Sequence, residues 1–295
     1  MAQKYDAAVI GGDSRQVYLA DILVREGFKV ITFGLAEKII ESGTQLFDAA
    51  SSAEQAVKSA LTVVAPIPMS KDNKHITVLD KKDNPLTVEE LLSYMDRSQF
   101  LISGSMTMYA EEFCVKNGIM HYDLMKSYEF SILNSIATAE GAIAHAVNNS
   151  IINIHKSNGL VLGYGRVGKV LANKLHALEM TVAVCARSRK DLTDIYVNGM
   201  ENLEYRQLED EIHRFDFVFN TVPSVVLDRK ILERLSSNTV IIDVASPPGG
   251  LDLEYAREMN LNVHICQGIP GKIAPLASAK IIADEIHPIL KERSD

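Results

Sequence analysis

Short apolar runs alternate with amphipathic segments along most of the chain. The first part contains five apolar runs of strand length, at residues 7–10, 29–33, 61–65, 100–102 and 120–122. Three segments between them have helical spacing, at residues 15–26, 87–95 and 109–117. Strands that alternate with helices are typical of parallel βαβ units, so the pattern predicts one open α/β domain. The polar stretch 69–85, with a short apolar run inside it, predicts a hairpin on the surface of this domain.

The second part repeats the alternation after a long helical segment. Residues 129–150 are free of proline and rich in Ala and Ile, which predicts a helix that bridges two domains. Five further strands are expected, at residues 160–162, 181–186, 217–219, 240–242 and 262–265. A last helix begins near residue 275 and comes after this second series is complete. We therefore expect residues 1–128 and 274–295 in one α/β domain and residues 151–273 in another.

Composition limits the classes of function. The 295 residues have a net charge of -8 and are 47% hydrophobic, which fits a globular protein of about two domains and makes nucleic acid an unexpected partner. Three widely spaced cysteines predict neither a disulfide framework nor a zinc cluster, and favour a reducing cytoplasm. The histidines lack metal-binding spacing, so no metal is expected. No apolar run approaches the ~18 residues of a membrane span, and we expect neither an export signal nor a bilayer anchor.

A glycine motif lies between the first strand and the first helix of the second domain. Gly163, Gly165 and Gly168 form a GxGxxG pattern in the strand–turn–helix context that dinucleotide binding requires. The first glycine permits the tight turn, the second lets the backbone approach a pyrophosphate, and the third allows close packing of helix on strand. The motif predicts a Rossmann domain whose loop contacts the cofactor through Gly163, Tyr164, Gly165, Arg166, Val167 and Gly168. The alternative is that these glycines serve packing alone.

The next strand end bears on the choice of cofactor. An NAD-selective site carries Asp or Glu about 20 residues beyond the glycines, for the ribose hydroxyls. Arg187, Ser188 and Arg189 stand there instead. Guanidinium groups suit the ribose 2′-phosphate, so the sequence favours NADP(H). Asp191 follows, but its place at a helix start has a capping explanation, and the alternative for the basic residues is a solvated turn.

Two further strand ends of this domain are expected beside the ligand. Ligands of open parallel sheets bind at the carboxyl ends of the strands. Thr221, Val222, Pro223 and Ala245 are expected to contact the cofactor near the nicotinamide ribose. The amides of Gly249 and Gly250 are expected to hold an anionic group of a substrate. The alternative for both segments is a turn chosen for its backbone angles.

The first domain carries a second candidate anion site. Gly11 and Gly12 follow a strand and open a helix, but the third glycine of the dinucleotide pattern is absent. We expect Gly12 and Arg15 to bind a smaller anion such as a carboxylate. Donors from Ser103, Gly104 and Ser105, after a later strand, are expected to join them. The alternative is that Arg15 is a solvated residue of the first helical turn.

Three residues are candidates for proton transfer. Glu140 lies among small residues on a mostly apolar helix, where an unpaired carboxylate is costly. Lys272 lies in the connection that returns to the first domain and is expected to reach the cleft. His121 stands at a strand end before the bridging helix. The alternatives are an ion pair between domains for Glu140 or Lys272, and a satisfied core histidine for His121.

Five segments together resemble the A subunits of dipicolinate synthase: residues 11–16, 137–142, 162–168, 243–250 and 270–275. The glycine loop is common to many dehydrogenases, whereas the combination of the other four segments is specific to far fewer proteins. The resemblance implies NADP-dependent oxidation with dehydration of 4-hydroxy-tetrahydrodipicolinate to dipicolinate, at a branch from the lysine/diaminopimelate pathway. It also implies that the partner is the flavoprotein-like B subunit of dipicolinate synthase, and a place in the mother-cell cytoplasm of a sporulating bacterium.

Other functions remain open from the residues alone. An NADP-dependent dehydrogenase of a 2-hydroxy or 2-amino acid has the same arrangement of domains and predicts turnover of a linear acid. A non-catalytic NADP-sensing protein predicts the same glycine loop but has no use for the anion-binding groups of the first domain. Two-domain enzymes of this kind are commonly oligomers, and we expect a homo-oligomer.

Overall fold

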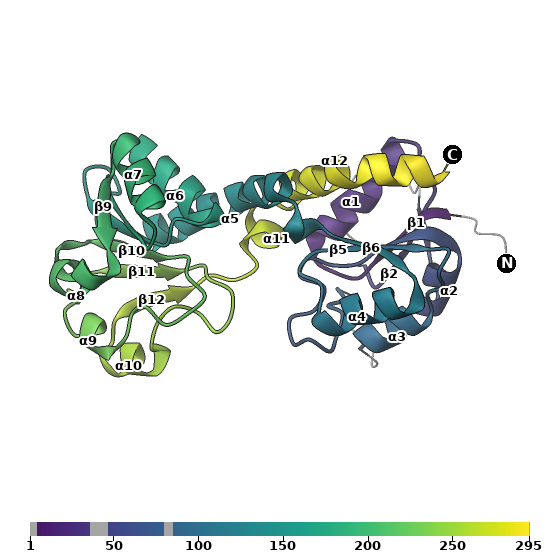
Figure 1. The fold of residues 1–295 in the computed structure, drawn as a ribbon, viewed down its shortest axis with the longest axis horizontal. Helices are drawn as coiled ribbons and strands as arrows, with labels where there is room; N and C mark the ends of the chain where they lie inside the picture. The colour runs from purple at the N-terminus through teal and green to yellow at the C-terminus, as the bar shows by residue number, and fades with distance from the viewer. Residues whose placement is uncertain (1–4, 36–46, 80–84, 295) are drawn as a thin grey trace. The chain divides into compact units, whose positions relative to one another are not determined.

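The computed structural model describes residues 5–35, 47–79 and 85–294, and it divides into two compact units. Unit 1 contains the described residues up to Leu133 and those from Ala274 onward. Unit 2 contains residues Asn134–Ile273. Each unit has its own parallel sheet flanked by helices (Figure 1). The predicted fold class, two doubly wound α/β domains, is therefore confirmed.

Unit 1 is built on six parallel strands in the order β3-β2-β1-β4-β5-β6. The strands are β1 Tyr5–Ile10, β2 Val30–Phe33, β3 Phe47–Ala49, β4 Ala60–Val64, β5 Phe100–Ser103 and β6 Met120–Asp123. This is the doubly wound order, with its switch point between β1 and β4, where ligands of such sheets bind. The edge strand β3 was not predicted.

Helices cover both faces of the unit 1 sheet. On one face α1 (Ser14–Arg25) and α12 (Pro275–Ser294) lie side by side and bury Leu19, Leu23, Ile282 and Ile286 against alternate residues of the strands (Figure 1). The opposite face packs on α2 Ala53–Lys58, α3 Val88–Ser93 and α4 Met108–Asn117. The C-terminal helix thus belongs to unit 1, because its apolar side completes that core.

The segment predicted as a surface hairpin matches that prediction only in part. Its described residues form no strand, and Ile76 is buried. The amide of Gly12 donates to Thr77 O at 2.6 Å, and the amide of Leu79 donates to Gly34 O at 2.9 Å. The segment therefore crosses the carboxyl ends of β1 and β2. Its two ends do pair as in a hairpin, through an antiparallel bridge between His75 and Thr87, but the expected strand does not form and Ile76 lies in the core and not on the surface. Residues 80–84 of that prediction lie outside the described residues.

Unit 2 is built on six parallel strands in the order β12-β11-β10-β7-β8-β9. They are β7 Asn158–Leu162, β8 Thr181–Ala186, β9 Glu201–Glu204, β10 Phe217–Asn220, β11 Val240–Asp243 and β12 Asn262–Ile265. The prediction of five strands is wrong, because it missed β9. This edge strand is polar, and only Leu203 in it is buried, so it lacks the apolar run that marks a central strand.

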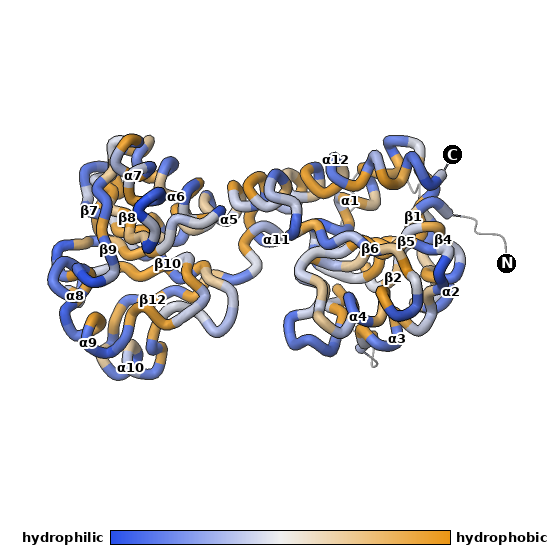
Figure 2. The backbone as a smooth tube through the Cα atoms, viewed as in Figure 1, coloured by the Kyte–Doolittle hydropathy of each residue, from blue (hydrophilic) through white to orange (hydrophobic). Residues whose placement is uncertain are grey.

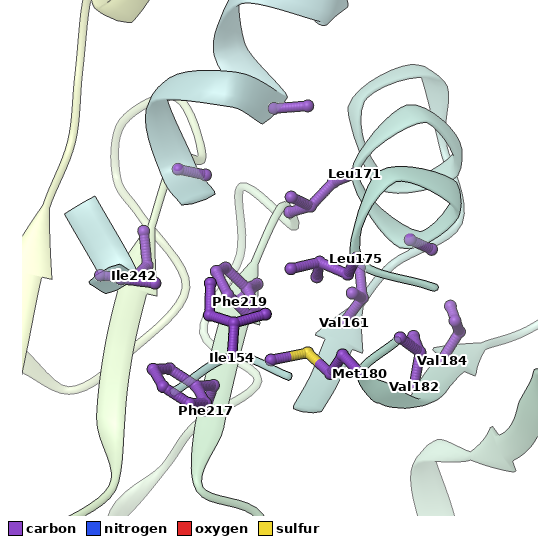
Figure 3. Packing of buried hydrophobic residues seen from close by; sticks show 14 of the residues in the cluster. Ile154, Val161, Leu171, Leu175, Met180, Val182, Val184, Phe217, Phe219 and Ile242 are labelled. Atoms are coloured by element: carbon purple, nitrogen blue, oxygen red, sulfur yellow. The ribbon is translucent and has the colours of Figure 1, made fainter. Parts of the chain in front are cut away.

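The helices of unit 2 are α6 Arg166–Ala177, α7 Arg189–Val197, α8 Leu208–Glu211, α9 Arg229–Leu232, α10 Leu253–Glu258 and α11 Ile269–Ile273, together with most of α5 (Tyr128–Asn148). Leu171 and Leu175 of α6 point toward Val161 and Phe219 of the sheet (Figure 3). The same cluster contains three alanines of α5, Ala139, Ala142 and Ala146. Figure 2 shows the resulting pattern, with hydrophobic residues along the strands and hydrophilic ones in outer turns.

The three cysteines form no disulfide. Cys114, Cys185 and Cys266 are all buried free thiols, as their wide spacing predicts. Within the described ranges, no helix combines the length and apolar character needed to cross a membrane. The same residues contain no cluster of three or more metal-binding side chains.

Candidate functional site

The glycine loop after β7 has the steric requirements of a dinucleotide fingerprint. Gly163 has φ +92°, a region that L side chains rarely adopt, and its amide donates to Cys185 O at 3.0 Å. A Cβ on Gly168 would lie 2.2 Å from the carbonyl oxygen of Gly163. The loop and the first turn of α6 are therefore packed so closely that only glycine fits at position 168.

The middle glycine faces open space. A Cβ on Gly165 would meet no atom within 4 Å, and Gly165 is the N-cap of α6 with no side-chain cap. A helix N-terminus with this much room, and without a capping side chain over it, favours an anion. The residues thus fit the pyrophosphate of a nicotinamide dinucleotide, with Gly165, Val167 and Gly168 closest to it by their place in the motif.

Tyr164 anchors this loop to the neighbouring helix. Its side chain is buried in the core cluster under α6, and Lys169 Nζ lies 4.8 Å from its ring centroid. Lys169 also lies 3.5 Å from a carboxylate oxygen of Asp194 on α7. Burial, with Asp194 and Asp191 nearby, raises the pKa of the Tyr164 hydroxyl, so Tyr164 stays neutral. Its role in this structure is to hold the loop against α7.

The turn after β8 presents positive charge. Arg187 and Arg189 are exposed, and Ser188 caps α7 by accepting a hydrogen bond from the amide of Asp191 at 3.0 Å. The Ser188 hydroxyl donates to the Asp191 carboxylate at 2.7 Å. Asp191 is thus engaged in the cap, as its sequence position suggested. The guanidinium of Arg187 lies 5.7 Å from the ring centroid of Tyr205.

A buried polar network joins the ends of β10 and β11, and sequence reasoning missed it. Asn220 and Asp243 are paired in the sheet and are essentially inaccessible to solvent. Asn220 Nδ2 donates to Asp243 Oδ1 at 3.0 Å, and Asn220 Oδ1 accepts from the amide of Val222 at 3.1 Å. The available signal was that each polar residue ends an apolar strand. The network shapes the turns that carry Thr221, Val222, Pro223 and Ala245.

The same network uses the amides that were expected to bind a substrate anion. The amide of Gly250 donates to Asp243 Oδ2 at 2.9 Å, and that of Gly249 donates to Ser246 O at 3.0 Å. A Cβ on Gly250 would lie 1.9 Å from Asn220 Nδ2, so this glycine is required for close approach. In this structure both amides already have acceptors, and an anion would have to replace them.

Arg15 in unit 1 is buried and paired. Its Nε and Nη2 each donate to Asp13 at 2.9 Å, and Nη2 also donates to Ile67 O. Burial opposes ionisation of Asp13, but the hydrogen bonds and charge of Arg15 outweigh it and lower the pKa of that carboxyl. Arg15 is therefore not the solvated residue of the alternative interpretation. An anion would meet a guanidinium whose charge Asp13 already balances.

The serine turn after β5 is also organised by internal hydrogen bonds. The Ser103 hydroxyl donates to Pro66 O at 2.7 Å, and a Cβ on Gly104 would lie 2.7 Å from Ile67. The amide of Ser105 donates to Asp123 Oδ1 at 2.9 Å. Ser105 itself is exposed, with φ +50°. Its hydroxyl is the donor of this turn that faces solvent, whereas the Gly12 amide is bonded to Thr77.

The three proton-transfer candidates have different surroundings. Glu140 forms an ion pair with Lys174 at 2.9 Å within unit 2, and both side chains are partly exposed. Lys272 is exposed on α11, which packs beside Gly141 of α5. His121 is half-buried in β6 of unit 1, with Nδ1 3.4 Å from Ile119 O. Glu140 and Lys272 thus lie on helices in mutual contact, and the partner of Glu140 is Lys174.

The fold and the glycine loop define a two-domain α/β protein with a nicotinamide-dinucleotide-binding domain. Residues 134–247 match the NAD binding domain of the D-isomer specific 2-hydroxyacid dehydrogenases. Residues 6–125 match the family described as the N-terminal domain of the dipicolinate synthase A subunit. The resemblance to the A subunits of dipicolinate synthase is therefore confirmed for the first domain.

Whole-chain comparisons find similar proteins with the same description. The chain is 27% identical to the dipicolinate synthase A subunit of Bacillus subtilis (strain 168), covering 97% of this chain and 95% of that protein. The crystal structure of the dipicolinate synthase A subunit from Bacillus halodurans matches with a TM-score of 0.85 and 28% identity, over 96% of this chain and 97% of that one. The Bacillus subtilis A chain structure matches with a TM-score of 0.84 and 26% identity, over 98% and 96%. Together these matches support an oxidoreductase of the dehydrogenase type.

Proposed function

We propose that this chain is the NADP-dependent dehydrogenase subunit of a dipicolinate synthase. The reaction is the oxidation, with dehydration, of 4-hydroxy-tetrahydrodipicolinate to dipicolinate. The observation that carries the proposal is similarity to the A subunits of dipicolinate synthase over almost the full length of both chains. Similarity of the nucleotide domain alone would support only a dehydrogenase, because that domain serves many substrates.

The choice of NADP over NAD is supported by the turn after β8. Arg187, Ser188 and Arg189 stand where an NAD site carries an acid, and the nearby Asp191 is engaged in the helix cap. Guanidinium groups bind a 2′-phosphate through charge-assisted hydrogen bonds. When bound, NADP+ supplies a hydride acceptor, the nicotinamide ring. The residues of unit 2 orient it: the glycine loop holds the pyrophosphate, and the Asn220–Asp243 network holds the turns of Thr221 and Ala245.

The substrate carries two carboxylates on a six-membered ring. Its conversion to the aromatic product removes one molecule of water and transfers one hydride and one proton. We assign the carboxylate contacts first to the Ser105 hydroxyl and Lys272. Arg15, Gly12, Ser103, Gly104, Gly249 and Gly250 are assigned lesser contributions, because their donors are largely engaged, those of Arg15 by Asp13. Glu140, Lys272 and His121 are the candidates for moving the proton. Of these, Glu140 is paired with Lys174, whereas neither Lys272 nor His121 forms an ion pair among the described residues.

The remaining elements of the proposal come with the family. The partner is the flavoprotein-like B subunit of dipicolinate synthase, because the relatives are named as A subunits of a synthase. The setting is the cytoplasm of the mother cell during sporulation, and the chain acts as a homo-oligomer. Co-purification with the B subunit tests the partner, and size-exclusion chromatography tests the oligomer.

The first experiment mixes the full chain, with and without the B subunit, with fresh 4-hydroxy-tetrahydrodipicolinate and either NADP+ or NAD+. Simultaneous growth of the reduced-nicotinamide and dipicolinate absorbance bands is expected with NADP+. If neither band grows with the B subunit present while NADP+ binds, the substrate assignment is wrong. Growth with NAD+ alone would overturn the cofactor assignment and leave the reaction standing.

Two variants with matched controls test the proton-transfer candidates. Lys272→Met is expected to lower turnover, whereas Lys280→Met, an exposed lysine of α12, is expected to leave it unchanged. Glu140→Gln is compared with Lys174→Met, which breaks the same ion pair but keeps the carboxylate. Loss of turnover in Glu140→Gln alone assigns a role to the carboxylate. Equal losses in both variants would indicate that only the ion pair matters.

A second candidate is an NADP-dependent dehydrogenase of a 2-hydroxy or 2-amino acid. The observation that favours it is the match of residues 134–247 to the 2-hydroxyacid dehydrogenases. It predicts NADPH-dependent reduction of linear 2-oxo acids, with ammonium added for the amino acids. Cofactor binding without turnover of either substrate class would favour the third alternative, an NADP-sensing protein.

A further inference from the structure

We propose that Tyr205 is a positioning residue for cofactor selectivity, which holds the guanidinium of Arg187 where the ribose 2′-phosphate of NADP binds. The inference rests on the proposed NADP dependence and adds a residue outside the strand–turn–helix motif. Tyr205 follows the edge strand β9, which the hydrophobic pattern of the sequence does not reveal.

The sheet register brings the two residues together. Ala186 of β8 pairs with Glu204 of β9, so Arg187 and Tyr205 are the first residues beyond two paired strand ends. The guanidinium carbon of Arg187 lies 5.7 Å from the centroid of the Tyr205 ring, within the range of a cation–π interaction. A ligand at the carboxyl end of β8 therefore meets an arginine whose side chain already has a preferred direction.

The ring of Tyr205 is held in place by its surroundings. It packs against the core cluster that contains Cys185 and Leu203. The turn that begins at Tyr205 is capped by Glu204 and Gln207, whose side chain accepts from the Glu204 amide at 2.9 Å. Because backbone and ring are both constrained, the ring is a fixed platform for a long side chain that would otherwise lose much rotamer freedom on binding.

A neutral ring orients Arg187 without balancing its charge. Burial, with Cys185 close by, raises the pKa of Tyr205 to about 12, so its hydroxyl keeps the proton at neutral pH. Within the described ranges Arg187 forms no ion pair, in contrast to Arg15, which is matched by Asp13. The full charge of Arg187 and its donors thus remain for a phosphate dianion, which is what preference for NADP requires.

The test is isothermal titration calorimetry of the full chain with NADP+ and with NAD+. Arg187→Ala is expected to weaken NADP+ binding about 10- to 100-fold and NAD+ binding little, because a charge-assisted hydrogen bond to the 2′-phosphate is lost. Tyr205→Leu is expected to weaken NADP+ binding about two- to fivefold and to leave NAD+ binding unchanged. Tyr205→Phe keeps the ring and is expected to bind both like the unmodified chain. In the Arg187→Ala background, Tyr205→Leu is expected to have no further effect.

A matched control is available in the same unit. Arg229 lies 5.0 Å from the ring of Tyr255, so Tyr255→Leu removes a contact of the same kind on α9 and α10. It is expected to leave the ratio of NADP+ to NAD+ affinity unchanged. Should Tyr205→Leu not fold, Tyr205→Met fills similar volume without a ring face, and its melting temperature checks the fold.

The outcomes separate the two levels of the proposal. The cofactor assignment fails, and the role of Tyr205 with it, in either of two cases. One is that the unmodified chain binds NAD+ as tightly as NADP+; the other is that Arg187→Ala leaves the ratio of NADP+ to NAD+ affinity unchanged. If Arg187→Ala lowers the ratio but the ring-removing variants do not, the cofactor assignment stands and the positioning role is overturned. Equal weakening of NADP+ and NAD+ binding by Tyr205→Leu would also overturn the positioning role, since a residue that only stabilises the fold affects both affinities alike.

Discussion

Asn220 donates a hydrogen bond through Nδ2 to Oδ1 of Asp243, 3.0 Å away, between the last residues of two adjacent parallel strands. The carboxylate of Asp243 also accepts from the amides of Ala245 and Gly250, at 2.8 and 2.9 Å. It is buried and accepts from three neutral donors, and it forms no ion pair within the described part of the chain. This pair ties the turn after β10 to the turn after β11, at the sheet edge where a dinucleotide is expected.

Asp243→Asn is expected to destabilise unit 2. The side-chain NH2 of asparagine would face at least one of the N–H groups that donate to the Asp243 carboxylate. Two buried donors would then lack an acceptor, which lowers the free energy of unfolding by about 1–3 kcal/mol. Urea-induced unfolding followed by circular dichroism measures the change. Asp210→Asn, an exposed acid of α8, is the control and is expected to stay within about 0.5 kcal/mol. Equal stability of both variants would contradict a structural role for the network.

Two glycines of one loop are expected to respond differently to alanine. Gly168→Ala puts a methyl group 2.2 Å from Gly163 O and is expected to lower both the melting temperature and dinucleotide affinity. Gly165→Ala meets no atom within 4 Å and is expected to fold normally, but to weaken binding at least tenfold, because its methyl group occupies the approach of the pyrophosphate. Calorimetric titration and thermal melts separate the effects. If Gly165→Ala binds the dinucleotide as tightly as the unmodified chain, the loop is not part of the cofactor site.

The contact between α5 and α11 gives a prediction about packing. A Cβ on Gly141 would lie 2.2 Å from Cγ2 of Ile269, both in unit 2. Gly141→Ala is therefore expected to cost about 1–3 kcal/mol through overpacking. In an Ile269→Ala background the same substitution is expected to be neutral or stabilising, since the clashing methyl group is gone and Ala favours a helix. Additive effects in this double-mutant cycle would argue against direct contact.

The Asp13–Arg15 pair predicts a pH-dependent contribution to the stability of unit 1. Arg15 lowers the pKa of Asp13, with a smaller effect from Lys71, against the opposing effect of burial. An unfolded aspartate has a pKa of about 3.9, so the stabilisation is fully present above about pH 4 and is lost as the pH falls through the lower folded value. Asp13→Asn is expected to be less stable than the unmodified chain at pH 7, with the deficit shrinking below pH 4.

Urea unfolding at several pH values between 7 and 3 checks this expectation. Asp21→Asn is a suitable control, because Asp21 pairs with Arg25 on the surface of the same helix at 3.0 Å. A surface pair contributes under about 1 kcal/mol. A deficit for Asp13→Asn that is constant across the range would show that the variant acts through packing or helix capping and not through charge.

Much of the fold follows from local patterns. The central strands were predictable because strands buried on both faces, such as β7 and β10, read as uninterrupted apolar runs. The edge strands β3 and β9 were not, since β9 buries only Leu203 and its pairing depends on the neighbouring strand. The path of residues 76–79 over β1 and β2 was missed for the same reason: long-range backbone hydrogen bonds to Gly12 and Gly34 determine it.

The candidate site divides in the same way. The glycine loop was predictable, because its spacing follows from the geometry of a single turn and the helix after it. The partners of Arg15, Glu140 and Gly250 were not, since Asp13, Lys174 and Asp243 compete for donors and acceptors only when side chains are packed. Tyr205 came into view only through the pairing of β8 with β9.

The α/β class, the position of the dinucleotide loop and the family resemblance can be read from the sequence, because each depends on residue types at short spacing along one chain. Which polar groups remain available to a ligand depends on the packing of residues far apart in the sequence. An N–H group donates to one acceptor at a time, and a buried polar group without a partner is costly. The Gly250 amide therefore already donates to Asp243, whereas Arg187 lies over the neutral ring of Tyr205 and its charge is not balanced. Both arrangements form only when the sheet brings the ends of neighbouring strands together.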